Sequence, residues 1–418
     1  MEKRLTAVSQ HYDIKIFFLF FLVTLANYYI YVGFAIKPYM IFCGLFLVIH
    51  LGTFSFQRLQ LFEVAMLLFY LVYSFSGAFA LYPSSSLRIF CGIILYIFCF
   101  FIIRFMIQDV GHPKIERGVS DAGIVFNLAS LILYFAGLKS FGFVFAGDRV
   151  FQYGVMLDRD YPRLIGLTQD PNFFVFYNTL FFVYFLCHAK SLKNKLGLIL
   201  CILTNLLTFS RGGIFVMGLL LLLFIMIKNP IKQFKLVLGI AIPLLVMLYT
   251  AIAYFNLDIV KILQSRMGDL SQDGGSGRLE LWGRAWDYFI SHMVLGIGAF
   301  NFMDYNQFQY GDNMEVHNTF LEILADSGLL GITSFCLFLL IVFIQIFRSN
   351  IPKNNPYLLL AFLGMILQMA FLSIIINDMF FMFMAILSAY LHEEQQLVKN
   401  RRGLLPFPLP QQKKANAH

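Results

Sequence analysis

Charged residues are scarce in this sequence of 418 residues: they make up only 13% of the chain, while 59% of the residues are hydrophobic. A chain with so little charge and a mean hydropathy of +0.75 cannot present a water-wetted surface as a globule, so it indicates an integral membrane protein. Long polar tracts are nearly absent as well. We therefore expect one polytopic domain rather than separate soluble domains.

Patterns typical of disulfides, metal sites and secretion signals are also missing. The six cysteines all lie within apolar runs, with no CxxC pair and no cluster in a loop, and we interpret them as small buried residues. The sequence has no DxD or Glu-x-x-His set expected to face outward, so nothing in it requires a metal. The first apolar run is too long for a signal-peptide core and precedes no cleavage pattern, which predicts a retained first span.

Apolar stretches of spanning length, by contrast, are abundant, and they predict an all-α fold: a polytopic bundle of about twelve transmembrane helices. Residues 1–255 are expected to hold transmembrane helices 1–9, residues 256–328 a large outer loop with short interfacial helices, residues 329–391 helices 10–12, and residues 392–418 a cytoplasmic tail. No internal repeat is evident. The individual spans are expected at roughly 15–33, 37–54, 61–80, 88–108, 122–139, 168–188, 196–210, 212–228, 236–255, 329–347, 357–374 and 377–391.

The positive charges divide between the two predicted faces by residue type. With the N-terminus inside, most lysines fall on the cytoplasmic side, as the positive-inside rule requires, and the outer cations are chiefly arginine. Topology needs only positive charge, whereas the planar fork of arginine suits bidentate contact with phosphate or carboxylate. Each outer arginine has an alternative role in pairing with outer-loop Asp and Glu, but as a group they indicate an anion site.

The stretch TQDPNFF, residues 168–174, stands at the outer mouth of the sixth predicted span. Asp170 before Pro171 fits a helix start, with the carboxylate capping free N–H groups and proline in the first helical position. The same carboxylate, or the side chain of Asn172, is also a candidate contact for a substrate. The stretch itself does not decide between the two roles.

The stretch TFSRGGIF, residues 208–215, lies between two apolar helices without a polar linker of normal length. An arginine at this depth costs several kcal/mol unless it meets a counter-ion or water. Gly212 and Gly213 permit a tight reversal and a close approach of a ligand to the backbone. We favour binding of an anionic ligand by Arg211; the alternative is a side chain that only fixes topology.

The stretch GGSGRLELWGRAWDYF, residues 274–289, predicts an amphipathic helix that lies on the bilayer. Trp282 and Trp286 fall one turn apart, at the depth that such rings prefer. Arg278 stands at the beginning of this helix and Arg284 on its more polar face. Both are candidates for the anion site, and interfacial anchoring without a ligand is the alternative.

The stretch VHNTFLEILADSGLLG, residues 316–331, predicts a short helix that Ser327 and Gly328 turn into the tenth span. Thr319 and Glu322 match a capping box, and Glu322 and Asp326 fall on the face opposite the apolar residues. His317 and Asn318 then stand just outside a helix N-terminus, whose partial positive charge favours anions. A lone histidine is usually structural, but these neighbours favour a proton acceptor or a hydrogen-bond partner of a substrate.

Together these stretches resemble the bacterial O-antigen polymerases and O-antigen ligases. The resemblance rests on SRGG (210–213), SGRLELWGRAWDYF (276–289) followed by LGIGAFNF (295–302), HNTFLEILADSGLLG (317–331) and, more weakly, QDPNFF (169–174). It extends over roughly residues 160–350. The first 150 residues match only as generic membrane spans.

The resemblance implies a GT-C-like, inverting glycosyltransferase of lipopolysaccharide or other surface polysaccharide biosynthesis, with no metal or other cofactor. Its donor would be a glycan on undecaprenyl diphosphate, bound at the periplasmic face of the bacterial inner membrane. Arginines at the positions of Arg211 and Arg278 would hold the diphosphate, with Arg284 as the alternative to Arg278, and His317 would take or orient the proton of the attacking hydroxyl. Asn318, Asp170 and Asn172 are the further candidates for substrate contact. The implied partners are the lipid-linked glycans, the membrane and a chain-length regulator protein, and no nucleic acid.

The acceptor separates the members of this family. A polymerase extends a lipid-linked repeat unit, whereas a ligase transfers the glycan to the lipid A core oligosaccharide; the His-Asn stretch favours the polymerase. A transporter is the main alternative outside the enzymes, and it would place charges at mid-membrane in two matched halves. Here the titratable residues gather at one face, with Asp378 as the chief exception, and no half repeats the other. A purely structural scaffold would need no convergence of arginines and a histidine.

Overall fold

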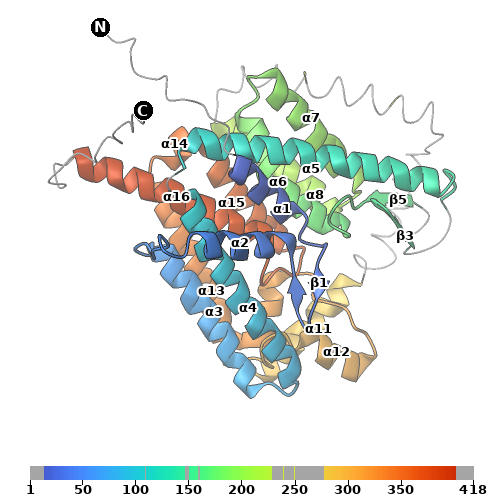
Figure 1. Ribbon diagram of the computed structural model, residues 1–418. Coiled ribbons are helices and arrows are strands. Elements are labelled where there is room, and N and C mark those ends of the chain that lie inside the picture. The colour runs from blue at the N-terminus through green and yellow to red at the C-terminus, as the bar shows by residue number, and fades with distance from the viewer. Residues whose placement is uncertain are drawn as a thin grey trace, which may run out of the picture.

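The computed structural model describes residues 14–227, apart from 109, 146–149 and 159–160, and residues 277–401, together with the isolated positions 239 and 249. Helices dominate this part of the chain, as expected (Figure 1). They are α1 (Ile14–Thr24), α2 (Pro38–Ile49), α3 (Leu61–Ser76), the 3₁₀ helix η1 (Gly77–Phe79), α4 (Pro83–Ile107), α5 (His112–Ser140), α6 (Pro171–Cys187), α7 (Leu192–Leu207), α8 (Arg211–Ile227), α11 (Arg278–Ser291), α12 (Phe302–Tyr310), α13 (Thr319–Arg348), α14 (Ile351–Asn354), α15 (Pro356–Met369) and α16 (Asp378–Arg401).

Two small antiparallel sheets interrupt the helices. One pairs β1 (Ile30–Tyr31) with β2 (Ala35–Ile36), and the other has the order β3 (Val150–Gln152), β4 (Val155–Asp158), β5 (Tyr161–Leu164). The first predicted span, 15–33, therefore ends as a helix at Thr24. Its remainder contains three tyrosines together with Ile30 and Val32, which favour strands, and Gly33 supplies the positive φ of +97° that the hairpin turn requires.

Every other predicted span within the described residues has a helix at its position, whereas span 236–255 lies outside them but for residues 239 and 249. Within the described residues, four helical stretches are long and apolar enough to cross a membrane: Leu61–Phe79, Pro83–Ile107, His112–Ser140 and Thr319–Arg348. Five further apolar helices in the same part of the chain have 10–17 residues. The protein is thus a membrane-type helical bundle, and the number of twelve spans remains a prediction.

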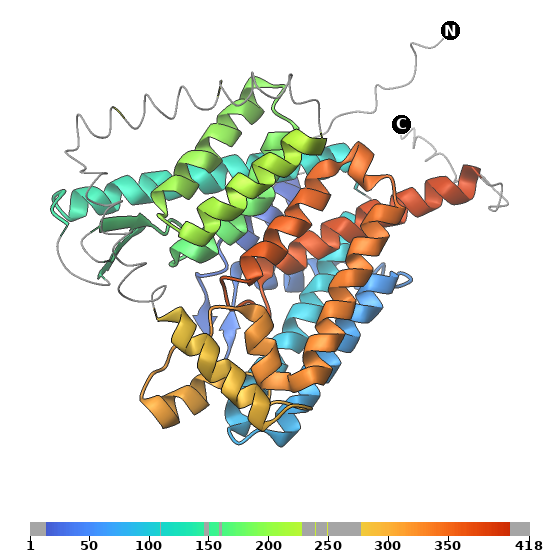
Figure 2. The same cartoon turned by 180° about the vertical axis from the view of Figure 1, so that it is seen from behind.

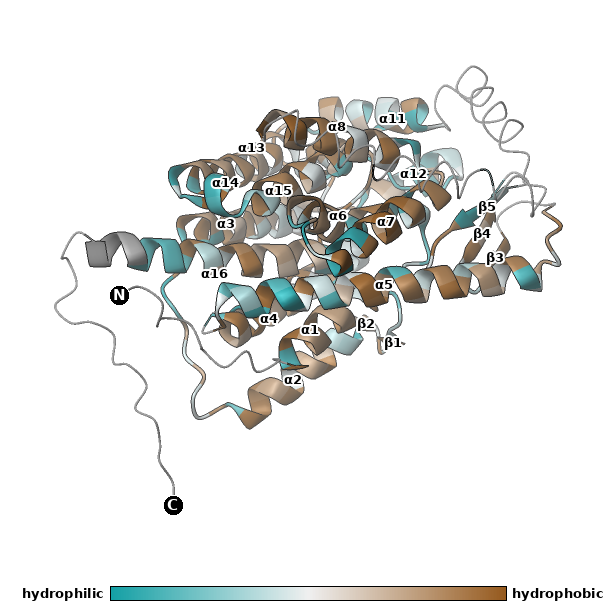
Figure 3. Cartoon of the chain, turned by 90° about the horizontal axis from the view of Figure 1, so that it is seen from above, coloured by the Kyte–Doolittle hydropathy of each residue, from teal (hydrophilic) through white to brown (hydrophobic). Residues whose placement is uncertain are grey.

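The long helices α3, α4 and α13 run alongside one another, with α11 and α12 at one end of this group (Figures 1 and 2). Helix α5 packs against α1 and α7 at the opposite end of the molecule. Most helices consist mainly of hydrophobic residues, while hydrophilic residues are frequent on α12 and α14 (Figure 3). Exposed apolar side chains such as Val48, Leu71 and Met226 fit contact with lipid.

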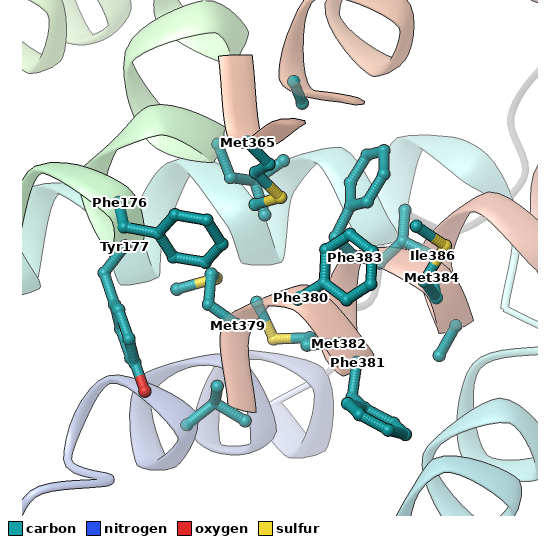
Figure 4. Close-up of a cluster of buried hydrophobic side chains, with 14 of the residues drawn as sticks. Phe176, Tyr177, Met365, Met379, Phe380, Phe381, Met382, Phe383, Met384 and Ile386 are labelled. Atoms are coloured by element: carbon teal, nitrogen blue, oxygen red, sulfur yellow. The ribbon is translucent and has the colours of Figure 1, made fainter. Parts of the chain in front are cut away.

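The centre of the bundle is formed by α6 and α16. Phe176 and Tyr177 of α6 pack with Met379, Phe380 and other residues of α16, and nearly every side chain from there to Leu391 is buried (Figure 4). A helix that is apolar on all sides is buried in a protein core or in a membrane, and here neighbouring side chains bury it. The N-terminal ends of both helices are therefore fixed by the core, and the site described below is built around one of them.

The connection between α15 and α16, residues 370–377, is not helical. Because α15 has 14 residues, it spans only about 21 Å of a hydrocarbon layer of roughly 30 Å. Irregular backbone at such depth needs partners within the protein. Tyr70 donates a hydrogen bond to the carbonyl of Ile375 (2.9 Å), and Thr319 donates to that of Leu372 (2.6 Å). This connection is therefore part of the folded interior.

Candidate active site

Four of the described helices begin at the predicted polar motifs. Side chains cap α6, α8 and α13, whereas α11 begins after Gly277 without a side-chain cap. Oδ1 of Asp170 accepts from the N–H groups of Asn172 (2.7 Å) and Phe173 (2.9 Å) at the start of α6. Oδ1 of Asn318 does the same for Phe320 (3.0 Å) and Leu321 (3.1 Å) at the start of α13. The prediction that Asp170 begins a helix is confirmed.

The start of α8 lies against the start of α6. Oγ of Ser210 accepts from the N–H of Gly213 at 3.2 Å and donates to Oδ1 of Asn172 at 2.7 Å. This contact brings Arg211, the first residue of α8, beside the Asp170 motif. Two segments that are separate in the sequence thus meet at one place.

The residue before each of these caps has the left-handed backbone that non-glycine residues avoid. The φ values are +58° at Gln169, +51° at Phe209 and +55° at His317. Gly277, before α11, has φ +72°. Such a conformation costs about 1–3 kcal/mol at a non-glycine residue and persists only where the surrounding structure holds it. The backbone therefore turns sharply just before each of these helices. This turn sets the direction of the first helical turn, where partial positive charge accumulates.

Arg278, the first residue of α11, belongs to a group of arginines. It is half-buried, and the pKa of its guanidinium is lowered by burial and by the positive charges of Arg211 and Arg163. Asp170 acts in the opposite direction. Three guanidinium groups thus share one region in which Asp170 supplies negative charge. Such a group of like charges favours an anionic ligand.

Arg163 was not among the predicted site residues. It lies on β5, where Nη1 contacts Oδ2 of Asp158 at 2.9 Å and Nε donates to the carbonyl of Thr208 at 3.0 Å. The second bond ties the small sheet to the turn between α7 and α8, and so to Arg211. The abundance of outer arginines indicated that further arginines could lie near the anion site. That Arg163 is one of them depends on a strand pairing that the sequence does not reveal.

Arg284 has different surroundings. Nη1 contacts Oδ1 of Asn306 at 2.7 Å and Oδ2 of Asp312 at 3.1 Å, Nη2 pairs with Glu280, and the ring of Tyr310 lies 4.0 Å from the guanidinium carbon. These contacts connect α11 with α12 and the chain after it. Of the two arginines on α11, the structure brings Arg278 to the arginine group and places Arg284 in these structural contacts.

His317 and Asn318 are held from two sides. The carbonyl of Val316 accepts from Nε1 of Trp282 on α11 at 3.1 Å, and the N–H of His317 donates to Oγ of Ser373 at 3.0 Å. Two residues before Ser373, Phe371 packs against Gly212 of α8. Residues 371–373 therefore lie between the start of α8 and the start of α13.

A model of a known family covers the centre of this site. Residues 196–336 match the family model described as O-antigen ligase. This match confirms the resemblance to the O-antigen polymerase and ligase family that the motifs indicated. A search of curated proteins gave no match to the chain.

The O-antigen ligase segment contains Arg211, Arg278, Arg284, His317 and Asn318. The other groups described above lie outside it: Arg163, Asp170 and Asn172 precede the segment, and Ser373 follows it. Within the described residues, no group of three or more His, Cys, Asp or Glu side chains is arranged to hold a metal ion.

The capping box predicted within this O-antigen ligase segment is wrong. Asn318 is the cap, and the hydroxyl of Thr319 instead donates to the carbonyl of Leu372 and accepts from the N–H of Ile374 (2.9 Å). Glu322 and Asp326, expected on an outer polar face, are 3% and 0% exposed. For Asp326 the reason is that the loop after α11 covers this face and uses its carboxylate as an acceptor for free N–H groups.

That loop explains the glycines of the family motifs. Oδ2 of Asp326 accepts from the N–H of Phe300 at 2.9 Å, and the N–H of Gly298 donates to the carbonyl of Asp326 at 2.9 Å. At the crossing, a Cβ on Gly328 would come within 2.5 Å of the carbonyl carbon of Val294. Gly328 has φ +60° and ψ −157° inside α13, so the predicted turn at Ser327 and Gly328 is confirmed as a kink.

Glu315 is a further residue that the sequence reading missed. Burial and the charge of Asp170 raise the pKa of its carboxyl to about 7. Glu315 therefore lies within electrostatic range of the capped start of α6, and two residues before His317. A carboxyl that titrates near neutral pH can exchange a proton during a reaction. No spacing pattern marked it in advance.

Proposed function

We propose that the protein is a membrane-embedded glycosyltransferase that moves a glycan from an undecaprenyl diphosphate donor to a lipid-linked repeat unit. It would thus act as a polymerase of O-antigen or a related surface polysaccharide. The O-antigen ligase match supports a transferase in this family. The donor, the acceptor and the mechanism are the parts that the proposal adds.

The observation that carries the proposal is the group formed by Arg163, Arg211 and Arg278. Burial, and after it the positive charges of Arg211 and Arg163, lower the pKa of the Arg278 guanidinium, and a bound diphosphate would offset the repulsion. Guanidinium groups match phosphate oxygens in geometry as well as charge. The capped starts of α6 and α8 add partial positive charge beside Arg211.

In the proposed reaction the acceptor hydroxyl oxygen attacks the anomeric carbon from the side opposite the diphosphate. The bond from that carbon to the diphosphate oxygen breaks, the diphosphate leaves with the electron pair, and the configuration inverts. His317 accepts the hydroxyl proton or orients the hydroxyl. Arg211 and Arg278 stabilise the leaving diphosphate, which needs positive donors rather than an acid.

The remaining candidates would contribute to substrate contact. Asp170 and Asn318 already use one oxygen each as helix caps, which leaves their second side-chain atoms for a sugar hydroxyl. Asn172 is fixed by Ser210 and would present its amide N–H groups. Arg284 remains the alternative to Arg278, and its contacts with Asp312 and Asn306 favour Arg278.

A ligase that transfers the glycan to the lipid A core is the second candidate, and the description of the matched family favours it. The His-Asn stretch supports the polymerase. A deletion strain separates the two on a polysaccharide gel. Loss of a polymerase leaves one repeat on the core, whereas loss of a ligase leaves bare core with accumulated lipid-linked polymer.

A transporter of the same lipid-linked substrate is the third candidate. Its main support would be the buried Asp378, but this carboxylate accepts from Nζ of Lys37 at 2.6 Å and from the hydroxyl of Tyr177 at 2.9 Å. These partners favour a structural ion pair.

We further propose that the site faces outward from the bacterial inner membrane and that a chain-length regulator is a partner.

The direct test is transfer by the purified protein in nanodiscs. With a lipid-diphosphate oligosaccharide as donor and a lipid-linked repeat as acceptor, we expect product without nucleotide sugar or added metal. His317→Ala should lower the rate by about 10²- to 10⁴-fold, the usual contribution of a proton-transferring group. Arg211→Ala should also abolish most activity. Persistence of transfer in both variants would refute the proposed roles.

A further inference from the structure

The connection between α15 and α16 lies outside the O-antigen ligase match, yet it contacts the backbone of the candidate catalytic histidine. Three consecutive residues at the start of α13, 317–319, face three consecutive residues of the connection, 372–374. The N–H of His317 donates to Oγ of Ser373 (3.0 Å), and Thr319 bonds to Leu372 and Ile374 (2.6 and 2.9 Å). The two hydrogen bonds of Thr319 hold the start of α13 against the connection. The hydrogen bond of Ser373 holds the peptide group of His317.

His317 needs such a bond because of its conformation. Its φ of +55° lies in the left-handed region, which a side chain with a Cβ occupies only under external constraint. On the other side of the same peptide group, the Val316 carbonyl is fixed by Trp282. The donor and acceptor of this peptide are thus both held by distant segments. Loss of the Ser373 bond would release the conformation that directs the imidazole.

A buried carboxyl lies close to Ser373. It belongs to Glu322, one turn into α13 and only 3% exposed. Among the described residues, Oε2 of Glu322 has no hydrogen-bond partner. A buried carboxyl favours any donor that it can reach. A Ser373 hydroxyl turned toward this carboxyl would keep its oxygen lone pairs for the N–H of His317.

We propose that Ser373 is a positioning residue that holds the backbone of His317 and so the place of its imidazole during glycan transfer. The inference rests on the proposed function of His317. It assigns a role in the reaction to a serine of the apolar connection FLSIIIN, outside the matched segment. Ser373 acts through His317 and contacts no substrate.

Ser373→Ala should lower kcat about 10- to 100-fold, because small displacements of a catalytic group have effects of this size. KM for the lipid-diphosphate donor should stay unchanged, since the arginines hold the diphosphate. Ser373→Thr keeps the hydroxyl and should keep most of the activity. Ser334→Ala is the matched control, because the Ser334 hydroxyl bonds only to a carbonyl of its own helix, that of Gly331.

The double variant Ser373→Ala/His317→Ala should be no slower than His317→Ala alone, because the serine acts through the histidine. Full kcat in Ser373→Ala, or additive losses in the double variant, would overturn the inference. Thermal melting of each variant separates a folding defect from a change in rate.

A second measurement does not depend on the proposed donor. The rate at which a histidine-acylating reagent modifies His317, followed by peptide mass analysis, should change in Ser373→Ala and stay as in the wild type in Ser373→Thr. If the wild type transfers no glycan but this rate changes, the proposed function fails and the positioning role stands. An unchanged rate in Ser373→Ala overturns the positioning role whatever the activity.

Discussion

Arg278 and Arg284 belong to the same helix, yet their charges are balanced in opposite ways. Arg284 is surrounded by Glu280, Asp312 and Asn306, all from its own part of the chain. Arg278 instead shares its surroundings with Arg163 and Arg211, which come from β5 and α8. Arg284 is neutralised by its contacts within the fold. Arg278 lies where the positive charges of Arg163 and Arg211 oppose its own.

This difference separates a structural arginine from a candidate binding arginine on physical grounds. A folded protein has no reason to bring three guanidinium groups together for stability, because their repulsion and desolvation both oppose it. Such a group is stabilised when an anion binds. The spacing of polar residues along α11 does not distinguish the two arginines, whereas their surroundings do.

The largest expected effect is that of removing Arg278. Arg278→Ala should lower glycan transfer by about 10²- to 10³-fold, which is typical for the loss of one donor to a transition-state anion. Arg278→Lys keeps the charge but not the planar fork, and it should fall between the alanine variant and the wild type. Transfer in nanodiscs, with kcat and KM for the donor, measures this effect.

Binding of inorganic diphosphate provides a control that does not require turnover. A ligand that binds only the folded state raises the melting temperature, so diphosphate should stabilise the wild type and Arg284→Ala but not Arg278→Ala. Equal losses of activity and of stabilisation in Arg278→Ala and Arg284→Ala would remove the distinction drawn between them.

A smaller effect, on stability rather than on transfer, is expected for Arg284. Arg284→Ala leaves Asp312 and the buried Asn306 without their partner and should lower the free energy of unfolding by about 1–3 kcal/mol. Activity should stay within about tenfold of the wild type. Thermal and denaturant melting in detergent measure the first quantity. Glu280→Gln is the matched control and should change stability little, because Glu280 is 70% exposed.

The smallest effect concerns Glu315 and pH. Its pKa is raised to about 7 in the folded protein, so the folded state holds a proton that the unfolded state loses near pH 4.5. This contribution to stability is complete below pH 4.5 and is lost as pH rises to about 7. Compared with the wild type, Glu315→Gln should therefore lose less stability between these pH values. Melting temperatures of both proteins across this range provide the measurement, and parallel curves would contradict it.

The sequence predicts candidate site residues where polar side chains stand out against apolar surroundings. Arg211 between two apolar helices and the His317-Asn318 pair before another were found in this way. The kink at Gly328 was also foreseen, because a Ser-Gly pair divides two apolar runs. In each case the informative residues are adjacent in the chain, so local rules suffice.

Residues that reach the site through tertiary contacts were missed. Arg163 depends on a strand pairing of β4 with β5, and Ser373 is a single hydroxyl in a stretch that was predicted as membrane span. The capping box at Thr319 failed for a similar reason. Its hydroxyl satisfies the connection after α15 rather than its own helix, and no pattern within residues 316–331 contains that information.

At the crossing between α13 and the loop after α11, the two backbones are in direct contact. Gly328 contacts the backbone around Val294 without an intervening side chain, and the indole of Trp282 donates a hydrogen bond to the carbonyl of Val316, just before His317. The helix that begins with Arg278 therefore cannot shift without taking the kinked helix along. If the proposed lipid carrier docks against the arginines, these contacts would couple its position to that of His317.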